Sequence, residues 1–181
     1  MAVYSRSCMD GSRRQKPPSF HYSRAQMIVL AVLQNMWVND PEKVKAMLAR
    51  TPQARRRMIR YSLFAGCRTG RVLKQLFGED CPRRFVWEES TTEIAGNPRD
   101  TFPADIFHLS AVVNEVTPDV VLAFGRIASD ALRKVVPEEK LLCGPHPTAR
   151  QADTLQRLRQ MASALDRMRT QYVDCSLKER N

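Results

Sequence analysis

The chain has 181 residues, of which 43% are hydrophobic and 27% are charged, a composition typical of one soluble globular domain. Its formal net charge is +10, with 29 Lys and Arg against 19 Asp and Glu, and most of the basic residues are arginine. This balance favours a nucleic-acid partner, because arginine makes paired hydrogen bonds to phosphate, and the lack of any apolar run of about 18 residues argues against a membrane span.

The five cysteines are scattered along the chain, with no C-x-x-C spacing. An odd number of cysteines in this arrangement is typical of a reducing compartment, so we expect a cytoplasmic protein. The spacing gives no ligand set for a metal or an iron–sulfur cluster. We therefore expect no metal and no other cofactor, and we expect the protein to be a monomer.

Composition divides the chain into a tail, a domain and a second, shorter tail. Residues 1–24 are rich in Ser, Arg and Pro and show no periodicity, which predicts a flexible basic segment with weak attraction to DNA. A transit peptide is the alternative, although its amphipathic pattern is missing. We expect the folded α/β domain over residues 25–172 and a C-terminal tail over 173–181.

Strands and helices alternate along the predicted domain. Buried strands are expected over residues 27–33, 84–88, 119–124 and 140–143. Helices are expected from residue 41, behind Asp40 as N-cap, and over 52–62, 71–77, 104–116, 126–135 and 150–172. This alternation predicts a three-layer α/β/α sandwich with a central four-stranded parallel sheet.

An unusual construction follows the fourth predicted strand. Here the chain reads Gly-Pro-His-Pro-Thr-Ala-Arg over residues 144–150, with His146 between two prolines. The prolines restrict the backbone on both sides, so the imidazole is held where the strand ends. Ligands of open α/β sheets bind beyond the carboxyl ends of strands. A structural turn is the alternative, but two other strand ends carry comparable motifs, so we favour a functional histidine.

Four motifs occur in order along the domain, each after a strand or in a loop. They are Leu33-Gln34-Asn35-Met36-Trp37, Phe64-Ala65-Gly66-Cys67-Arg68-Thr69-Gly70-Arg71-Val72-Leu73, Ala123-Phe124-Gly125-Arg126-Ile127-Ala128-Ser129-Asp130-Ala131-Leu132 and His146-Pro147-Thr148-Ala149. In this order they resemble the motifs of the uracil-DNA glycosylase superfamily, over roughly residues 27–150. The resemblance implies the fold of that superfamily and hydrolysis of an N-glycosidic bond in DNA. Two positions depart from the pattern, because Leu33 and Met36 replace the usual Gly and Pro.

The resemblance assigns catalytic roles to His146 and Asn35. Negative charge builds on the departing base while the sugar becomes cationic, so a hydrogen-bond donor at the base carbonyl stabilises the transition state. His146 is the candidate donor. Water must attack the sugar from its other face, and Asn35 is the candidate that orients it. Because an amide cannot accept the proton, Asn35 implies catalysis by positioning.

The candidates for binding the flipped base are Gln34, Trp37, Phe64 and Glu88. We expect Phe64 against the face of the base and Trp37 as a wall that fixes the pocket size; core packing is the alternative for both. Glu88 aligns best with the position where the superfamily usually has a base-reading Asn. A carboxylate accepts from the amino group of cytosine and repels the uracil carbonyl. A solvated acid at a strand end is the alternative, and a shift of one residue to Glu89 leaves the argument unchanged.

A cytosine-type target predicts a modified base, because cells mostly have no reason to remove ordinary cytosine. Hydroxymethylated or glucosylated cytosine of phage DNA fits this requirement, and an antiviral glycosylase that leaves an abasic site follows as the expected function. Three alternatives stay open: a repair glycosylase for uracil or mismatches, a catalytically inactive nucleic-acid-binding module, and a nucleotide-binding α/β protein with other chemistry.

The candidates for contacts to the DNA backbone are Arg68, Arg126, Thr148 and Arg150. Arg126 and Thr148 lie at strand ends that lead into helix N-termini, where backbone N–H groups favour anions. Arg150 stands where members of the superfamily carry the loop that enters the duplex. The run of three arginines at 55–57 is interpreted as a solvated helix face, with an extended DNA footprint as the alternative.

Overall fold

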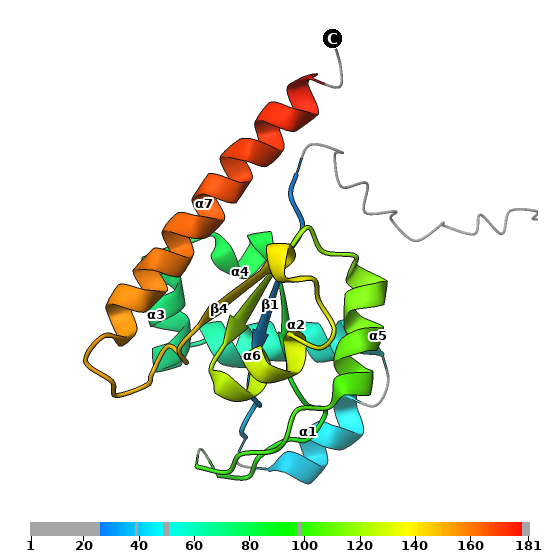
Figure 1. Ribbon diagram of the computed structural model, residues 1–181. Coiled ribbons are helices and arrows are strands. Elements are labelled where there is room, and N and C mark those ends of the chain that lie inside the picture. The colour runs from blue at the N-terminus through cyan, green and yellow to red at the C-terminus, as the bar shows by residue number, and fades with distance from the viewer. Residues whose placement is uncertain (1–25, 39, 49–50, 98, 179–181) are drawn as a thin grey trace, which may run out of the picture.

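A computed structural model of the chain describes residues 26–38, 40–48, 51–97 and 99–178. Over these residues four strands form one sheet in the order β2-β1-β3-β4, and all neighbouring strands are parallel. Helices pack against both faces of this sheet (Figure 1). The predicted α/β sandwich with a four-stranded parallel sheet is confirmed. The tail predicted over residues 1–24 lies outside the described residues.

Each predicted strand is present within two residues of its expected bounds. The strands are β1 (Val29–Leu33), β2 (Phe85–Glu89), β3 (Val120–Phe124) and β4 (Leu141–Gly144). The helices are α1 (Pro41–Leu48), α2 (Pro52–Phe64), α3 (Arg68–Phe77), α4 (Cys81–Arg84), α5 (Ile106–Val116), α6 (Arg126–Leu132) and α7 (Thr154–Lys178), and a 3-10 turn η1 (Glu138–Lys140) precedes β4. The sequence did not predict α4 or η1, because a single turn is too short to show periodicity.

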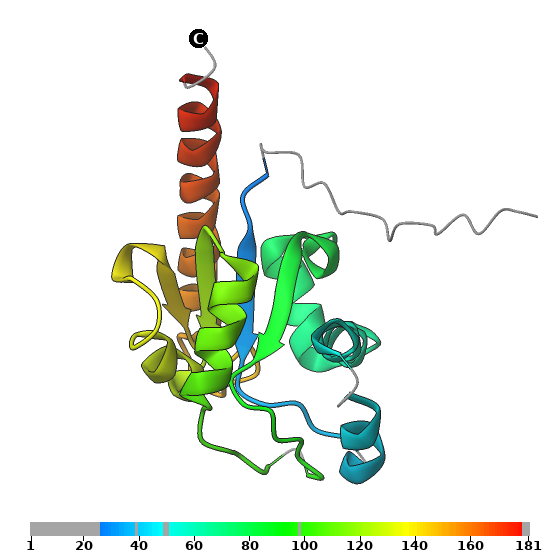
Figure 2. The same cartoon turned by 90° about the vertical axis from the view of Figure 1, so that its right-hand side faces the viewer.

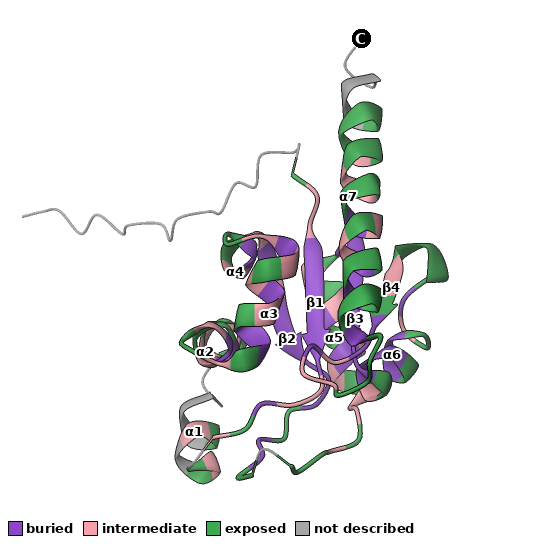
Figure 3. Cartoon of the chain, turned by 90° about the vertical axis from the view of Figure 1, so that its left-hand side faces the viewer, coloured by how far each residue is buried: buried purple, intermediate pink, exposed green. Residues whose placement is uncertain are grey.

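The two faces of the sheet bury separate cores, since successive side chains of a strand point to opposite sides. Trp87 and Phe124 lie on one face, where they pack with side chains of α2, α3 and α7. Leu30 and Ala123 lie on the other face, against α5 and α6. Strand β1 is buried along its whole length (Figure 3), which explains its uninterrupted apolar sequence.

The last helix departs from prediction at both ends. It begins at Thr154 rather than at residue 150, and it continues to Lys178, so the tail predicted from residue 173 is wrong over 173–178. Leu158 and Leu165 are buried against the sheet, and the remainder of α7 rises past it (Figure 2). No Gly or Pro interrupts this remainder, so helical hydrogen bonding continues where burial has stopped. None of the described helices is both long and apolar enough to cross a membrane.

The strand order opens a crevice at the carboxyl ends of the strands. The chain moves from β1 to β2 on one side and later passes to β3 on the other, which makes β1 the point where direction reverses. The segment after β1 stays extended, because Val38 N–H donates to the Ala95 carbonyl and Ala95 N–H donates to the Met36 carbonyl, both at 2.9 Å. The loops that follow β1 and β2 therefore form one rim of the crevice.

Candidate functional site

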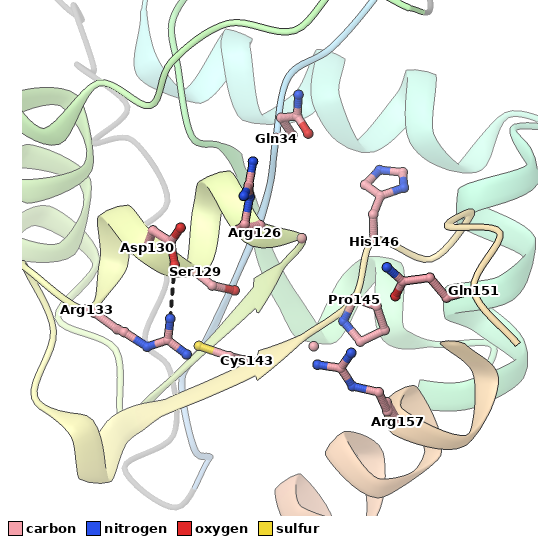
Figure 4. A pocket seen from close by; sticks show the side chains of 12 residues that line it. Gln34, Arg126, Ser129, Asp130, Arg133, Cys143, Pro145, His146, Gln151 and Arg157 are labelled. Carbon is pink, nitrogen blue, oxygen red and sulfur yellow. Dashed lines mark hydrogen bonds and ion pairs between the residues drawn. The ribbon is translucent and has the colours of Figure 1, made fainter. Parts of the chain in front are cut away.

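Two cavities meet in this crevice, and Gln34 and His146 line both of them. The main cavity has a volume of about 680 Å³ and the second, which we call the arginine cavity, about 410 Å³. Seven of the predicted site residues line the main cavity: Gln34, Asn35, Trp37, Arg68, His146, Thr148 and Arg150. The eighth, Arg126, lines the arginine cavity together with Arg133 and Arg157 (Figure 4). Phe64 and Glu88 line neither.

The environment of His146 fixes which of its ring nitrogens is a donor. The backbone N–H of Thr148 donates to Nδ1 at 3.3 Å, and Thr148 Oγ1 lies 3.0 Å from the same atom. Nδ1 is therefore the acceptor, and Nε2 carries the hydrogen of the neutral ring. Burial lowers the pKa of His146 below its ordinary value, which also favours the neutral form. The ring thus offers a neutral N–H donor where the two cavities meet.

Gly125 allows the β3–α6 connection to pass close to His146. Its φ angle is +92°, a left-handed conformation that favours glycine, and an added Cβ would lie 3.5 Å from the Cβ of His146. The Gly125 N–H donates to the Gly144 carbonyl at 2.8 Å, which ties the ends of β3 and β4 together. The His-Pro segment is thereby held against the start of α6.

Asn35 is held by the loop that precedes α5. Its Nδ2 donates to the Asp100 carbonyl at 3.3 Å, which leaves Oδ1 as the acceptor available for a water molecule. The neighbouring backbone is anchored as well, since Ser90 Oγ donates to the Gln34 carbonyl at 2.6 Å and Ser90 N–H donates to the Leu33 carbonyl at 2.8 Å. The amide of Asn35 can therefore orient a nucleophile without acting as a base.

Two acids line the main cavity, Asp100, which is exposed, and Glu89, which is buried. The side chain of Glu89 is buried at the end of β2, and its Oε2 has no hydrogen-bond partner among the described residues. Burial raises the pKa of Glu89 to about 8, and the nearby negative charge of Glu88 contributes to the rise. At neutral pH the carboxyl group is therefore protonated, and it offers one O–H donor and one carbonyl acceptor.

Glu88, the predicted base-reading acid, lies on the opposite face of β2. There its carboxylate pairs with Arg55 and Arg56, at 3.0 and 3.5 Å, close to the ring of His108. Burial by itself would raise the pKa of Glu88, but His108, Arg55 and the N–H of Glu89 together hold it below its ordinary value. The prediction that Glu88 lies in the base-binding cavity is therefore wrong. Side chains of successive residues in a pleated strand point to opposite faces, so Glu89 enters the cavity and Glu88 points away from it.

Two further predictions, both for side chains of α2, are wrong. Phe64 packs edge-on against Trp87, with ring centroids 5.0 Å apart, so it contributes to the core rather than to the main cavity. Arg55 and Arg56 are paired and mostly buried rather than solvated; only Arg57 of this run is exposed. The sequence of α2 alone could not show that Arg55 and Arg56 pair with Glu88, an acid on a different element.

The rim of the main cavity carries the aromatic and basic side chains that the sequence singled out. Trp37 lines the mouth of the cavity and is 48% exposed, so the cavity is open to solvent on this side. Arg68, the first residue of α3, and Arg150, in the segment before α7, are both exposed and line this cavity. Close packing of α3 on α2 holds this rim, because a Cβ on Gly70 would overlap the Leu63 carbonyl oxygen. The mouth of the cavity therefore carries positive charge from two exposed arginines.

Comparison of the chain with models of protein families, with curated proteins and with solved structures gave no match. Within the described residues, no group of three or more His, Cys, Asp or Glu side chains is arranged to hold a metal ion.

Proposed function

We propose that this protein is a monofunctional DNA glycosylase of the uracil-DNA glycosylase type, which hydrolyses the N-glycosidic bond of a flipped-out base. The observation that supports it most is the meeting of His146, Asn35 and Glu89 in one cavity beyond the carboxyl ends of the strands. These side chains supply a neutral donor, an amide that orients water and a group that hydrogen-bonds the base. A monomer located in the cytoplasm remains part of this proposal, and the four described cysteines are free.

The proposed mechanism divides the work between the two ends of the scissile bond. The Nε2–H of His146 donates to the carbonyl oxygen of the departing base, where negative charge develops. Asn35 holds water at the anomeric carbon, and the cationic sugar needs little help from a strong base. The bond between base and sugar breaks with its electron pair going to the base, the water oxygen bonds to the sugar, and that water loses a proton to solvent while the departing base anion takes one up from solvent. The products are the free base and an abasic site.

Because the carboxyl of Glu89 is protonated, it does not repel the uracil carbonyl as an ionised carboxylate would. Its carbonyl can accept from the amino group of cytosine while its O–H donates to N3; with the roles exchanged, it complements N3–H and O4 of uracil. The volume of about 680 Å³ and the open wall at Trp37 favour a base with a bulky substituent. A modified cytosine, hydroxymethylated or glucosylated as in phage DNA, is therefore our proposed target, in antiviral defence; uracil is the alternative.

The test is an abasic-site assay on a panel of otherwise identical DNAs. The panel contains cytosine, hydroxymethylcytosine, glucosylated hydroxymethylcytosine, uracil and hypoxanthine, each in single and double strands. Release of a modified cytosine would support the proposal in full, and release of uracil alone would support a repair glycosylase. If every DNA is bound and none loses a base, the glycosylase proposal is wrong and the chain is an inactive binding module.

The proposed contacts to the DNA backbone are Arg126, which lines the arginine cavity, and Arg68, Thr148 and Arg150, which line the main cavity. Replacing Arg126 or Arg150 with Gln should each reduce the magnitude of the slope of log K against log salt concentration by about 1, where K is the association constant for DNA. The reason is that DNA binding with one phosphate contact fewer releases about one counterion fewer. Arg83→Gln is the matched control, since Arg83 is exposed at the other end of the sheet, before β2. Equal slopes for all three variants in a titration by fluorescence anisotropy would remove both residues from the interface.

The inactive binding module remains the second candidate because of the first motif. Leu33 and Met36 are 4% and 5% exposed and belong to the core under α2. Met36 is also held by Ser62, whose Oγ lies 3.3 Å from its sulfur. The backbone after β1 therefore follows a path fixed by core packing rather than by the usual Gly and Pro. Turnover in the panel assay separates the two candidates.

A further inference from the structure

A buried ion-pair cluster lies behind Glu89, on the other face of β2. The carboxylate of Glu88 is its centre, with side-chain exposures of 2% for Glu88, 11% for Arg55 and 18% for Arg56. Removing such charges from water costs so much that a buried pair seldom stabilises a fold more than apolar side chains of the same shape would. A cluster placed directly next to a cavity residue therefore indicates a role in that cavity.

The cluster fixes the backbone on both sides of Glu89. Arg55 Nη2 donates to the Thr91 carbonyl at 2.6 Å, and Nη1 donates to the Thr92 carbonyl at 3.3 Å. Glu88 Oε1 accepts from Arg55 Nε at 3.0 Å and from the N–H of Glu89 at 3.1 Å. One guanidinium and one carboxylate thus join α2, the end of β2 and the loop that follows it.

We propose that Arg55 and Glu88 are positioning residues for the main cavity, which hold the Glu89 carboxyl in place and set the electrostatic field around it. The kinetic part of this inference rests on the proposed glycosylase function. The structural part does not, because the state of Glu89 can be measured directly.

The charges around Glu89 act in opposite directions. The carboxylate of Glu88 disfavours a second negative charge on Glu89 and so raises its pKa, whereas the guanidinium of Arg55 opposes the rise. The other charged or titratable groups that line the main cavity or surround the cluster are Lys45, Arg56, Cys67, Arg68, Asp100, His108, Glu115, His146 and Arg150. Glu88 is the acid whose carboxylate contacts the backbone of Glu89, so its charge has the most direct effect.

Glu88→Gln tests the electrostatic part. The amide keeps an acceptor for Arg55 but removes the negative charge, so the titration midpoint of the Glu89 carboxyl should fall by about 1 pH unit or more. The measurement is a carbon-13 NMR titration of the carboxyl groups in the full chain, with Glu89→Gln to assign the signal. Glu79→Gln is the matched control, because Glu79 is an exposed acid beyond the end of α3. An unchanged midpoint in Glu88→Gln, or an equal shift in Glu79→Gln, would overturn the inference.

Arg55→Lys tests the positioning part. Lysine keeps the charge but cannot reach the Glu88 carboxylate and both loop carbonyls at once. We expect faster amide hydrogen exchange over residues 89–92 and several-fold slower base release, with the Glu89 midpoint close to that of the wild type. Unchanged exchange over 89–92 would exclude this part. If titration and exchange behave as expected while no DNA loses a base, the positioning inference stands and the proposed function fails.

Discussion

His146→Ala is expected to reduce the rate of base release about 10²- to 10³-fold, the effect of removing one preorganised donor from a developing negative charge. The structure gives the reason, because the Thr148 N–H occupies Nδ1 at 3.3 Å and leaves Nε2–H as the free donor. Affinity for DNA should change little, since the neutral ring makes no ion pair with phosphate. Single-turnover release from the best substrate of the panel measures the rate, and anisotropy measures binding.

His146→Gln is the matched variant for this prediction. A glutamine amide keeps an N–H donor on a side chain of similar reach, so we expect a rate between those of the wild type and His146→Ala. Thermal melting of all three proteins establishes that the comparison is between folded chains. A His146→Ala protein that releases the base as fast as the wild type would remove His146 from the mechanism.

Base release should also decline as pH rises through about 8, where Glu89 ionises and loses its O–H donor. Glu89→Gln keeps one donor and one acceptor and cannot ionise, so its rate should stay level across the same range. Glu89→Leu removes both hydrogen bonds and should lower kcat/KM roughly 10- to 100-fold, the size of one bidentate base contact. A pH profile of kcat/KM for the three proteins is the measurement. An alkaline decline that persists in Glu89→Gln would assign it to another group.

Thermal stability gives a second measurement of Glu89 that does not depend on activity. Its pKa of about 8 in the folded protein exceeds the ordinary value of 4.5, so the native state keeps a proton that the unfolded chain releases. Stability contributed by this group is present below about pH 4.5 and is lost as pH rises towards 8. The Tm of Glu89→Gln should therefore exceed that of the wild type by more at pH 8 than at pH 5. An equal difference at both values would mean that Glu89 is ionised in the folded state.

Much of the candidate site followed from local sequence. The motif around His146 and the segment that carries Asn35 each come directly after an apolar run, and parallel strands place such ends along one edge of a sheet. For that reason Gln34, Asn35 and His146 could be expected together before the structure was known. Their side chains do line one cavity.

The failures concern residues whose surroundings come from distant segments. The run Glu88-Glu89 ends a strand that is buried on both faces, so sequence gives no alternation to show which acid faces the cavity. Phe64 lies at the end of α2, and only its contact with Trp87 shows that it faces the core. The pairing of Arg55 with Glu88 joins residues 33 positions apart.

The sequence by itself determined the four strands, the helices between them except the single turn α4, and the edge of the sheet where chemistry is expected, because periodicity and strand-end motifs are local properties. Only the tertiary structure decided which of two adjacent acids enters the cavity and in which protonation state. That choice depends on the pleat of β2 and on how completely α2, α3 and the loop after β1 exclude water from Glu89, and neither is encoded in any short stretch of the chain.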